Sequence, residues 1–162
     1  MREFKLSLHT WTIDSTPLEV CLDATAQAGF DAIELRHLDF ARCAQAGMSR
    51  EQTVEVIRAS GVQLGVLGTE YGWFFAEPDE QQRLYDVLRE TCRTAVELGC
   101  DMVMSAPGQT TGPLQNAIDA TRVAGEIVAA FGLRLALDFN SQPPLVNRPE
   151  VRKILMVISD GA

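Results

Sequence analysis

The sequence predicts a parallel α/β fold in which short strands alternate with helices within one sheet. Three observations predict it: a glycine-led phrase recurs four times, each recurrence leads into a short run that is apolar on both faces, and helical periodicity accompanies these runs. Parallel strands that are covered by helices are typically apolar throughout. Short right-handed connections leave two topologies open, namely part of an eight-stranded β/α barrel or a five-stranded doubly wound sheet.

The recurring phrase combines the end of one helix with the strand that follows it. It is clearest at residues 28–36, which read Ala-Gly-Phe-Asp-Ala-Ile-Glu-Leu-Arg, and it returns at 60–67, 98–105 and 131–138. Its glycines recur at intervals of about 32 to 38 residues, which is the length of one strand-plus-helix unit. They are Gly29, Gly61, Gly99 and Gly132. Each glycine is expected just past a helix, in the left-handed conformation that ends it.

The predicted elements follow in order along the chain. The predicted strands are 5–8, 32–35, 63–67, 102–104 and 133–137. Helices are predicted to begin near Thr16, Ser49, Asp79 and Pro113, because a start signal at each position precedes apolar residues at helical spacing. Thr16 is expected to cap the first helix, and Ser49 the second together with Gln52. Residues 141–162 are predicted to be a loop and a C-terminal helix, and residues 1–162 are expected to form a single domain.

Composition and charge exclude several classes of protein. The chain has 162 residues, is 46% hydrophobic, and contains no apolar run near the ~18–20 residues that a membrane span requires. Its net charge of −8 would repel a phosphate backbone. The four cysteines form no Cys-x-x-Cys pair, and we interpret them as small buried hydrophobic residues in a reducing compartment. We therefore expect a cytoplasmic protein with no nucleic-acid or membrane partner.

Three features bear on the choice between the open topologies. Length favours the doubly wound sheet, because a complete barrel usually needs about 250 residues. The turn after the first strand, residues 9–16, lacks the glycines that hold phosphate in nucleotide-binding open sheets. Three strands also end in the same pattern, in which a small residue is followed two positions later, on the same face of the strand, by a polar residue. These pairs are Ser7 and His9, Ala32 and Glu34, and Ala136 and Asp138. Such a pattern suits a barrel interior with functional groups at its mouth.

Three segments resemble a known family. Residues 6–12, 28–36 and 131–140 are similar to the first, second and fifth strand regions of the xylose-isomerase-like TIM-barrel superfamily, which includes sugar phosphate isomerases and epimerases. The resemblance covers about residues 4–148 and implies the N-terminal five-strand part of a TIM barrel. The family builds a full barrel, so we expect a truncated chain that is inactive alone. An open arc leaves unpaired strand edges. We therefore expect the chain to associate with a second copy in a homo-oligomer or with a complementary half-barrel.

The resemblance also implies a chemistry. In the family a divalent metal, Mn or Mg, lies at the barrel mouth, and carboxylates move a proton next to a carbonyl of a small carbohydrate or keto-acid-like substrate. Asp138 falls where the family usually has a glutamate metal ligand. Asp138 and Glu34 are therefore the candidate catalytic residues, although Glu34 also has an ordinary interpretation as an ion-pair partner of Arg36. The other family ligands have no counterpart here, so we expect weak or absent metal binding by this chain.

The candidate substrate-binding residues are His9, Trp11, Glu70, Trp73 and Asn140. His9 would bind a sugar hydroxyl, and the two tryptophans would form an aromatic wall for a sugar ring. The ordinary alternatives are a packed histidine and an aromatic lid. Ser105 differs from the metal-binding histidine of the endonuclease branch, which disfavours DNA repair. A second hypothesis is a non-catalytic interaction module that pairs with a complementary chain.

Overall fold

The structure is a computed structural model that describes residues 5–108 and 112–138. Within these ranges five parallel strands form one sheet in the order β1-β2-β3-β4-β5. The strands are β1 Ser7–His9, β2 Ala32–Arg36, β3 Gln63–Gly68, β4 Met102–Ser105 and β5 Arg134–Leu137. All five lie within two residues of the predicted positions. The predicted loop and helix at 141–162 lie outside the described residues.

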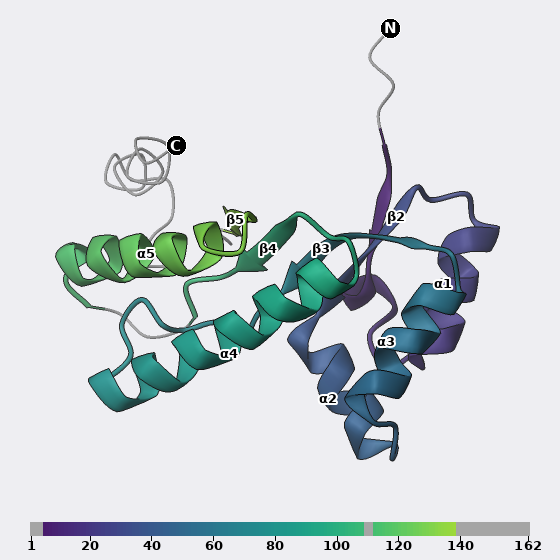
Figure 1. Ribbon diagram of the computed structural model, residues 1–162, viewed down its shortest axis with the longest axis horizontal. Coiled ribbons are helices and arrows are strands. Elements are labelled where there is room, and N and C mark those ends of the chain that lie inside the picture. Colours follow the sequence, from purple (N-terminus) through teal and green to yellow (C-terminus); the bar gives the residue numbers. More distant parts are fainter. Residues whose placement is uncertain (1–4, 109–111, 139–162) are drawn as a thin grey trace, which may run out of the picture.

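The helices alternate with the strands. They are α1 Leu18–Gln27, α2 His37–Gln45, α3 Arg50–Ala59, α4 Pro78–Glu97 and α5 Leu114–Ala129, with a short 3₁₀ helix η1 at Thr10–Ile13. Figure 1 shows α1, α2 and α3 gathered at one end of the sheet and α4 alongside α5 at the other. No helix in the described ranges is long and apolar enough to cross a membrane.

The strand order decides between the two predicted topologies. A doubly wound sheet reverses its strand order at a switch point, whereas the strands of a barrel follow one another around the circle. Here every strand pairs with its neighbours in the sequence and no order is reversed. The sheet is therefore a five-strand arc of a barrel, and the doubly wound alternative is wrong.

Glycines and caps set the ends of the helices. The four repeat glycines all have positive φ, between +69° and +75°, as predicted for residues that close a helix. Ser49 and Gln52 form the predicted capping box at the start of α3. The first helix differs, because Pro17 stands at its N-cap and no side chain caps it, so the predicted cap by Thr16 is wrong. α4 likewise begins at Pro78, one residue before the predicted Asp79.

Helix α2 was not predicted from the sequence. It begins directly after β2, where the backbone N–H of Arg36 donates a hydrogen bond of 2.8 Å to the Asp39 carboxylate. The helical periodicity of α2 was not recognised in the sequence, because β2 ends at Arg36 and α2 begins at the next residue, with no turn residue between them. The detectable signal was the acid three residues after Arg36, the spacing of a capping box.

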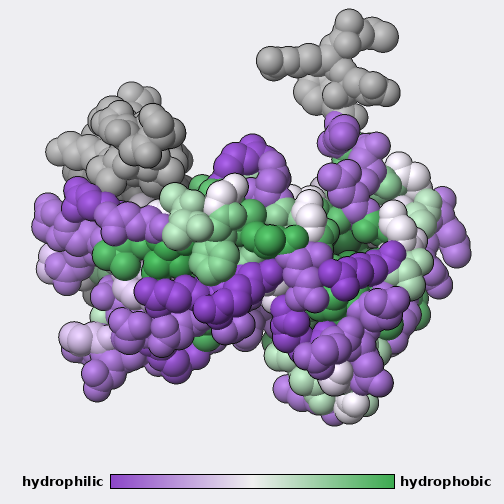
Figure 2. All heavy atoms as spheres, viewed as in Figure 1, coloured by the Kyte–Doolittle hydropathy of each residue, from purple (hydrophilic) through white to green (hydrophobic). Residues whose placement is uncertain are grey.

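The core lies between the sheet and the helices. On β2, Ile33 and Leu35 are fully buried, while the residues that alternate with them are only partly buried. The same alternation places Val103 of β4 in the core beside Leu88 of α4. Figure 2 shows that the exposed surface of α4 is mostly hydrophilic and that a hydrophobic band runs along α5 toward β4. All four cysteines are buried and free, as the interpretation of small core residues requires.

Small residues line the other face of the sheet. Strand register places Ser7 opposite Ala32 and His9 opposite Glu34, so the shared parity predicted for β1 and β2 is confirmed. A side chain on Gly65 would come within 3.1 Å of the Ala32 Cβ and 3.4 Å of the Ser7 Oγ. On this face, the pair of His9 and Glu34 lies toward the carboxyl ends of β1 and β2.

Candidate functional site

His9 and Glu34 form the centre of the site. His9 is the last residue of β1, and Glu34 is its register partner in β2. His9 Nε2 lies 3.3 Å from Glu34 Oε1. Their side chains are 28% and 21% exposed, so both are partly withdrawn from water. A histidine and a carboxylate at this distance can share the movement of a proton.

The His9 ring is held in one orientation by the backbone. The Trp11 N–H donates a hydrogen bond of 2.9 Å to His9 Nδ1, which makes His9 the side-chain cap of η1. Because Nδ1 accepts this bond, the neutral ring carries its proton on Nε2, the nitrogen that faces Glu34. The ring therefore presents a donor to the carboxylate or to an oxygen of a ligand.

Glu34 has an unusual electrostatic environment. Burial raises the pKa of its carboxyl, His9 opposes that shift, and the negative charge of Asp138 adds to it. The backbone N–H of Asp138 donates 2.9 Å to the carbonyl of Ser105, which fixes its place beside β4. The structure thus brings His9 and Glu34 into contact, and Asp138 follows β5 at the same edge of the sheet.

A network that the sequence analysis missed lies just beyond this pair. It consists of Thr10, Arg36 and Asp39, and we call it the strand-end clamp. Asp39 is only 9% exposed, and its carboxylate accepts from the Thr10 hydroxyl at 2.5 Å and from Arg36 Nη2 at 2.6 Å. Arg36 also donates to Asp14, so its charge is directed at Asp39 and Asp14. The alternative that Glu34 is the ion-pair partner of Arg36 is therefore wrong.

Glu70 lies at the end of β3 but faces different partners. Arg83 of α4 donates two hydrogen bonds to its carboxylate, at 2.6 and 3.1 Å, and His37 Nε2 lies 3.8 Å away. These bonds hold the pKa of Glu70 below its ordinary value, mainly through Arg83. Glu70 is thus a fixed carboxylate acceptor, unlike the carboxylate of Glu34.

The two candidate tryptophans have different surroundings. Trp11 is 72% exposed, with its ring centre 6.3 Å from that of His9. Trp73 is fully buried, packs on Phe74 with ring centres 4.2 Å apart, and donates its indole N–H to Ser105 Oγ at 2.9 Å. The predicted wall of two exposed aromatic rings is therefore not present in the described structure. Asn140 lies outside the described residues.

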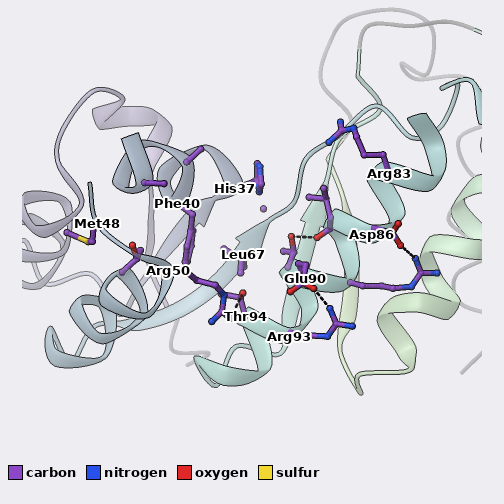
Figure 3. Close-up of a pocket in the computed structure, with 17 residues that line it drawn as sticks. His37, Phe40, Met48, Arg50, Leu67, Arg83, Asp86, Glu90, Arg93 and Thr94 are labelled. Atoms are coloured by element: carbon purple, nitrogen blue, oxygen red, sulfur yellow. Dashed lines mark hydrogen bonds and ion pairs between the residues drawn. The ribbon is translucent and has the colours of Figure 1, made fainter. Parts of the chain in front are cut away.

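A larger hollow lies on the helix side of the sheet. This groove, of about 720 Å³, runs between α2 and α3 on one side and α4 on the other, with Leu67 at its floor (Figure 3). Phe40, Met48 and Val87 give it apolar walls. Every arginine that lines it pairs with a carboxylate of the chain. They are Arg50, Arg83, Arg89 and Arg93. The groove therefore offers volume but no charged group free for chemistry.

The described residues do not by themselves assemble a metal centre. Over 5–108 and 112–138, no three side chains of histidine, cysteine, aspartate or glutamate come together in a way that could hold an ion. Asp138 supplies one carboxylate, which suits Mg²⁺ or Mn²⁺ but is too few for firm binding. Any further ligand would have to come from outside these residues.

Comparisons with known proteins identify relatives of this fold. Residues 22–150 match a family model described as xylose isomerase-like TIM barrel. No curated protein sequence matches the chain significantly. Among solved structures, the IolI protein with a bound zinc atom has a TM-score of 0.80 at 17% identity, covering 96% of this chain and 59% of that one. The chain thus spans about three fifths of that protein's length.

Two further solved structures are similar. D-allulose 3-epimerase from Methylomonas sp., in complex with D-allulose, has a TM-score of 0.73 at 16% identity, covering 98% of this chain and 60% of that one. A fusion protein of a xylose isomerase-like TIM barrel with 4-hydroxyphenylpyruvate dioxygenase has a TM-score of 0.76 at 24% identity, covering 96% and 25% of the two chains. These likenesses establish the fold.

Proposed function

Because this chain belongs to the xylose isomerase-like TIM barrel family, we propose that it takes part in isomerase or epimerase chemistry. The reaction is proton transfer at a carbon next to a carbonyl, on a small carbohydrate or keto-acid-like substrate. The observation that supports the proposal is the contact between His9 and Glu34 toward the carboxyl ends of β1 and β2, with the charge of Asp138 acting on Glu34. Barrel enzymes place their chemistry at this end.

Glu34 is the base in this proposal. Partial burial makes its carboxylate harder to ionise, and a carboxylate with a raised pKa is a better proton acceptor once it is ionised. His9 Nε2 is placed to donate to a substrate oxygen beside Glu34. The exposed ring of Trp11 covers one side of the same opening, where it would contact the apolar face of a sugar.

A divalent metal, Mn or Mg, would be held partly through Asp138. When bound, it polarises the oxygen of the carbonyl next to the reacting carbon. Since the described residues supply too few ligands, we expect weak metal binding and no net isomerisation by these 162 residues alone, so that slow proton exchange is the only partial reaction to measure. The four free, buried cysteines support a reducing compartment, and we place the protein in the cytoplasm.

Exchange of the substrate proton with solvent tests the proposal without knowledge of the product. The chain is incubated in D₂O with a ketohexose such as D-allulose, with Mn²⁺ or with a chelator, and loss of the proton next to the carbonyl is followed by NMR. We expect slow exchange that requires Mn²⁺ and Glu34. Glu34→Gln should abolish it, while the matched control Glu80→Gln, an exposed glutamate on α4, should not. Exchange that persists in Glu34→Gln, or no exchange in the native chain at any metal concentration, contradicts the proposal.

One observation favours a second candidate, a non-catalytic module that pairs with a complementary half-barrel or with a second copy. Among the described strands, β1 and β5 each pair on one side only, which leaves backbone groups available for another chain. Light scattering after size-exclusion chromatography should then show a dimer or larger species. A compact monomer that binds no hydrophobic dye argues against pairing.

A further inference from the structure

The strand-end clamp satisfies a buried charge completely. The Asp39 carboxylate accepts from the Thr10 hydroxyl, from Arg36 Nε and Nη2, and from the Arg36 backbone N–H. The Thr10 hydroxyl in turn accepts from Arg36 Nε at 3.0 Å. Apolar residues of similar volume often stabilise a site as well as a buried ion pair does. What the ion pair adds is a fixed geometry, because each bond has a direction.

The clamp holds the two backbones that carry His9 and Glu34. Thr10 directly follows His9 in the chain, and Arg36 lies two residues after Glu34, on the same face of β2. The Thr10 hydroxyl and the Arg36 guanidinium both donate hydrogen bonds to the Asp39 carboxylate. A displacement of β1 against β2 would therefore disturb the clamp as well as the pair.

The clamp also controls the His9 ring through η1. The ring is oriented by the Trp11 N–H, and Trp11 follows Thr10 within that helix. The far end of η1 is tied as well, because Asp14 accepts from Arg36 Nη1 at 2.7 Å and from Arg42 Nη1 at 2.8 Å. Arg36 thus holds both ends of the segment that orients the imidazole.

We propose that Thr10, Arg36 and Asp39 are positioning residues that hold the imidazole of His9 against Glu34. The inference rests on the proposed function in that the pair is taken as the proton-transfer site. In this role the clamp contacts neither the substrate nor the reacting atoms. It acts through the strand ends and through η1.

The test uses Thr10→Val, which removes the hydroxyl and keeps the shape of the side chain. The matched control is Thr121→Val, a buried threonine whose hydroxyl donates within α5 to the Ala117 carbonyl. We expect hydrogen exchange of the Trp11 amide to be about tenfold faster in Thr10→Val, the factor for losing one hydrogen bond. It should be unchanged in the control.

A second readout separates positioning from stability. In the native chain, Glu34→Gln should shift the ¹⁵N resonances of the His9 imidazole, because the two groups are in contact. In the Thr10→Val background the same replacement should shift them far less. A clamp that only stabilises the fold would lower the melting temperature and leave both readouts unchanged, and that result overturns the proposal.

Asp14→Asn provides a variant at an exposed position of the same network, for which folding is not at risk. It should accelerate Trp11 exchange in the same direction by a smaller factor, and no acceleration would contradict the role of η1. Failure of the proposed function can be distinguished from failure of the positioning role. Absent ketose proton exchange together with the expected NMR responses would leave the positioning role intact and remove only the chemistry.

Discussion

Glu34 and Glu70 are two glutamates near the carboxyl ends of neighbouring strands, and their surroundings have opposite effects. Burial and the charge of Asp138 raise the pKa of Glu34, whose contact is a histidine. Two hydrogen bonds from Arg83 lower the pKa of Glu70. In the proposed function, the same residue type would be a proton acceptor in one place and a fixed anion in the other. The partner, and not the position along the barrel, decides the role.

The largest effect expected from this comparison is on catalysis. Glu34→Gln should lower the rate of ketose proton exchange by about 10²- to 10⁴-fold, the contribution of one general base. Glu70→Gln should instead raise KM by a few-fold with little change in kcat, because a carboxylate held by Arg83 can bind a hydroxyl but is a poor base. Steady-state kinetics of both variants separate the two roles. Equal losses of kcat would remove the distinction between the two glutamates.

The two regions also differ in how they are held. Glu34 lies within β2, whereas Glu70 lies in the segment between β3 and α4 that is anchored by Trp73. Ser105→Ala should cost about 1–3 kcal/mol of unfolding free energy, because the buried indole N–H loses its partner. Urea denaturation measures this cost. A cost near zero would indicate that the Glu70 segment does not depend on this bond.

The pH dependence of stability should have opposite signs for the two glutamates. For Glu34, whose folded pKa is raised, stabilisation is present at low pH and is lost as pH rises from 4.5 through the folded value. For Glu70, whose folded pKa is lowered, stabilisation is present above 4.5 and is lost as pH falls through the folded value. Melting temperatures between pH 3 and 8 for the native chain, Glu34→Gln and Glu70→Gln should therefore diverge in opposite directions. Parallel curves for the two variants would contradict the assignment.

The smallest effect concerns the partner of Glu70. Arg83→Gln should change the unfolding free energy little, because its pairs with Glu70 and Glu80 are exposed. It should nevertheless raise the pKa of Glu70 toward its ordinary value, since Arg83 is the main cause of the shift. Chemical denaturation and carboxyl NMR check the two statements. An unchanged Glu70 pKa would assign the shift to His37 instead.

Periodicity was enough to predict the strands, but it left two topologies open, and the barrel arc was implied by the resemblance of three segments to a known family. The repeat glycines and the apolar runs are local signals, and the shared parity of His9 and Glu34 follows from the alternation of side chains along a strand. The sequence could not predict the strand-end clamp, because Thr10, Arg36 and Asp39 meet only after two strands are paired. The burial of Trp73 was missed for the same reason. An aromatic residue after a strand has the same local pattern whether it faces a ligand or packs on Phe74.

The proposal depends on the raised pKa of the Glu34 carboxyl, which burial and the charge of Asp138 cause. Carboxyl ¹³C NMR of Glu34 against pH, in the native chain and in Asp138→Asn, tests it most directly. The account predicts a Glu34 pKa above the ordinary glutamate value in the native chain and a partial return toward that value in Asp138→Asn. An ordinary Glu34 pKa in both proteins would contradict it.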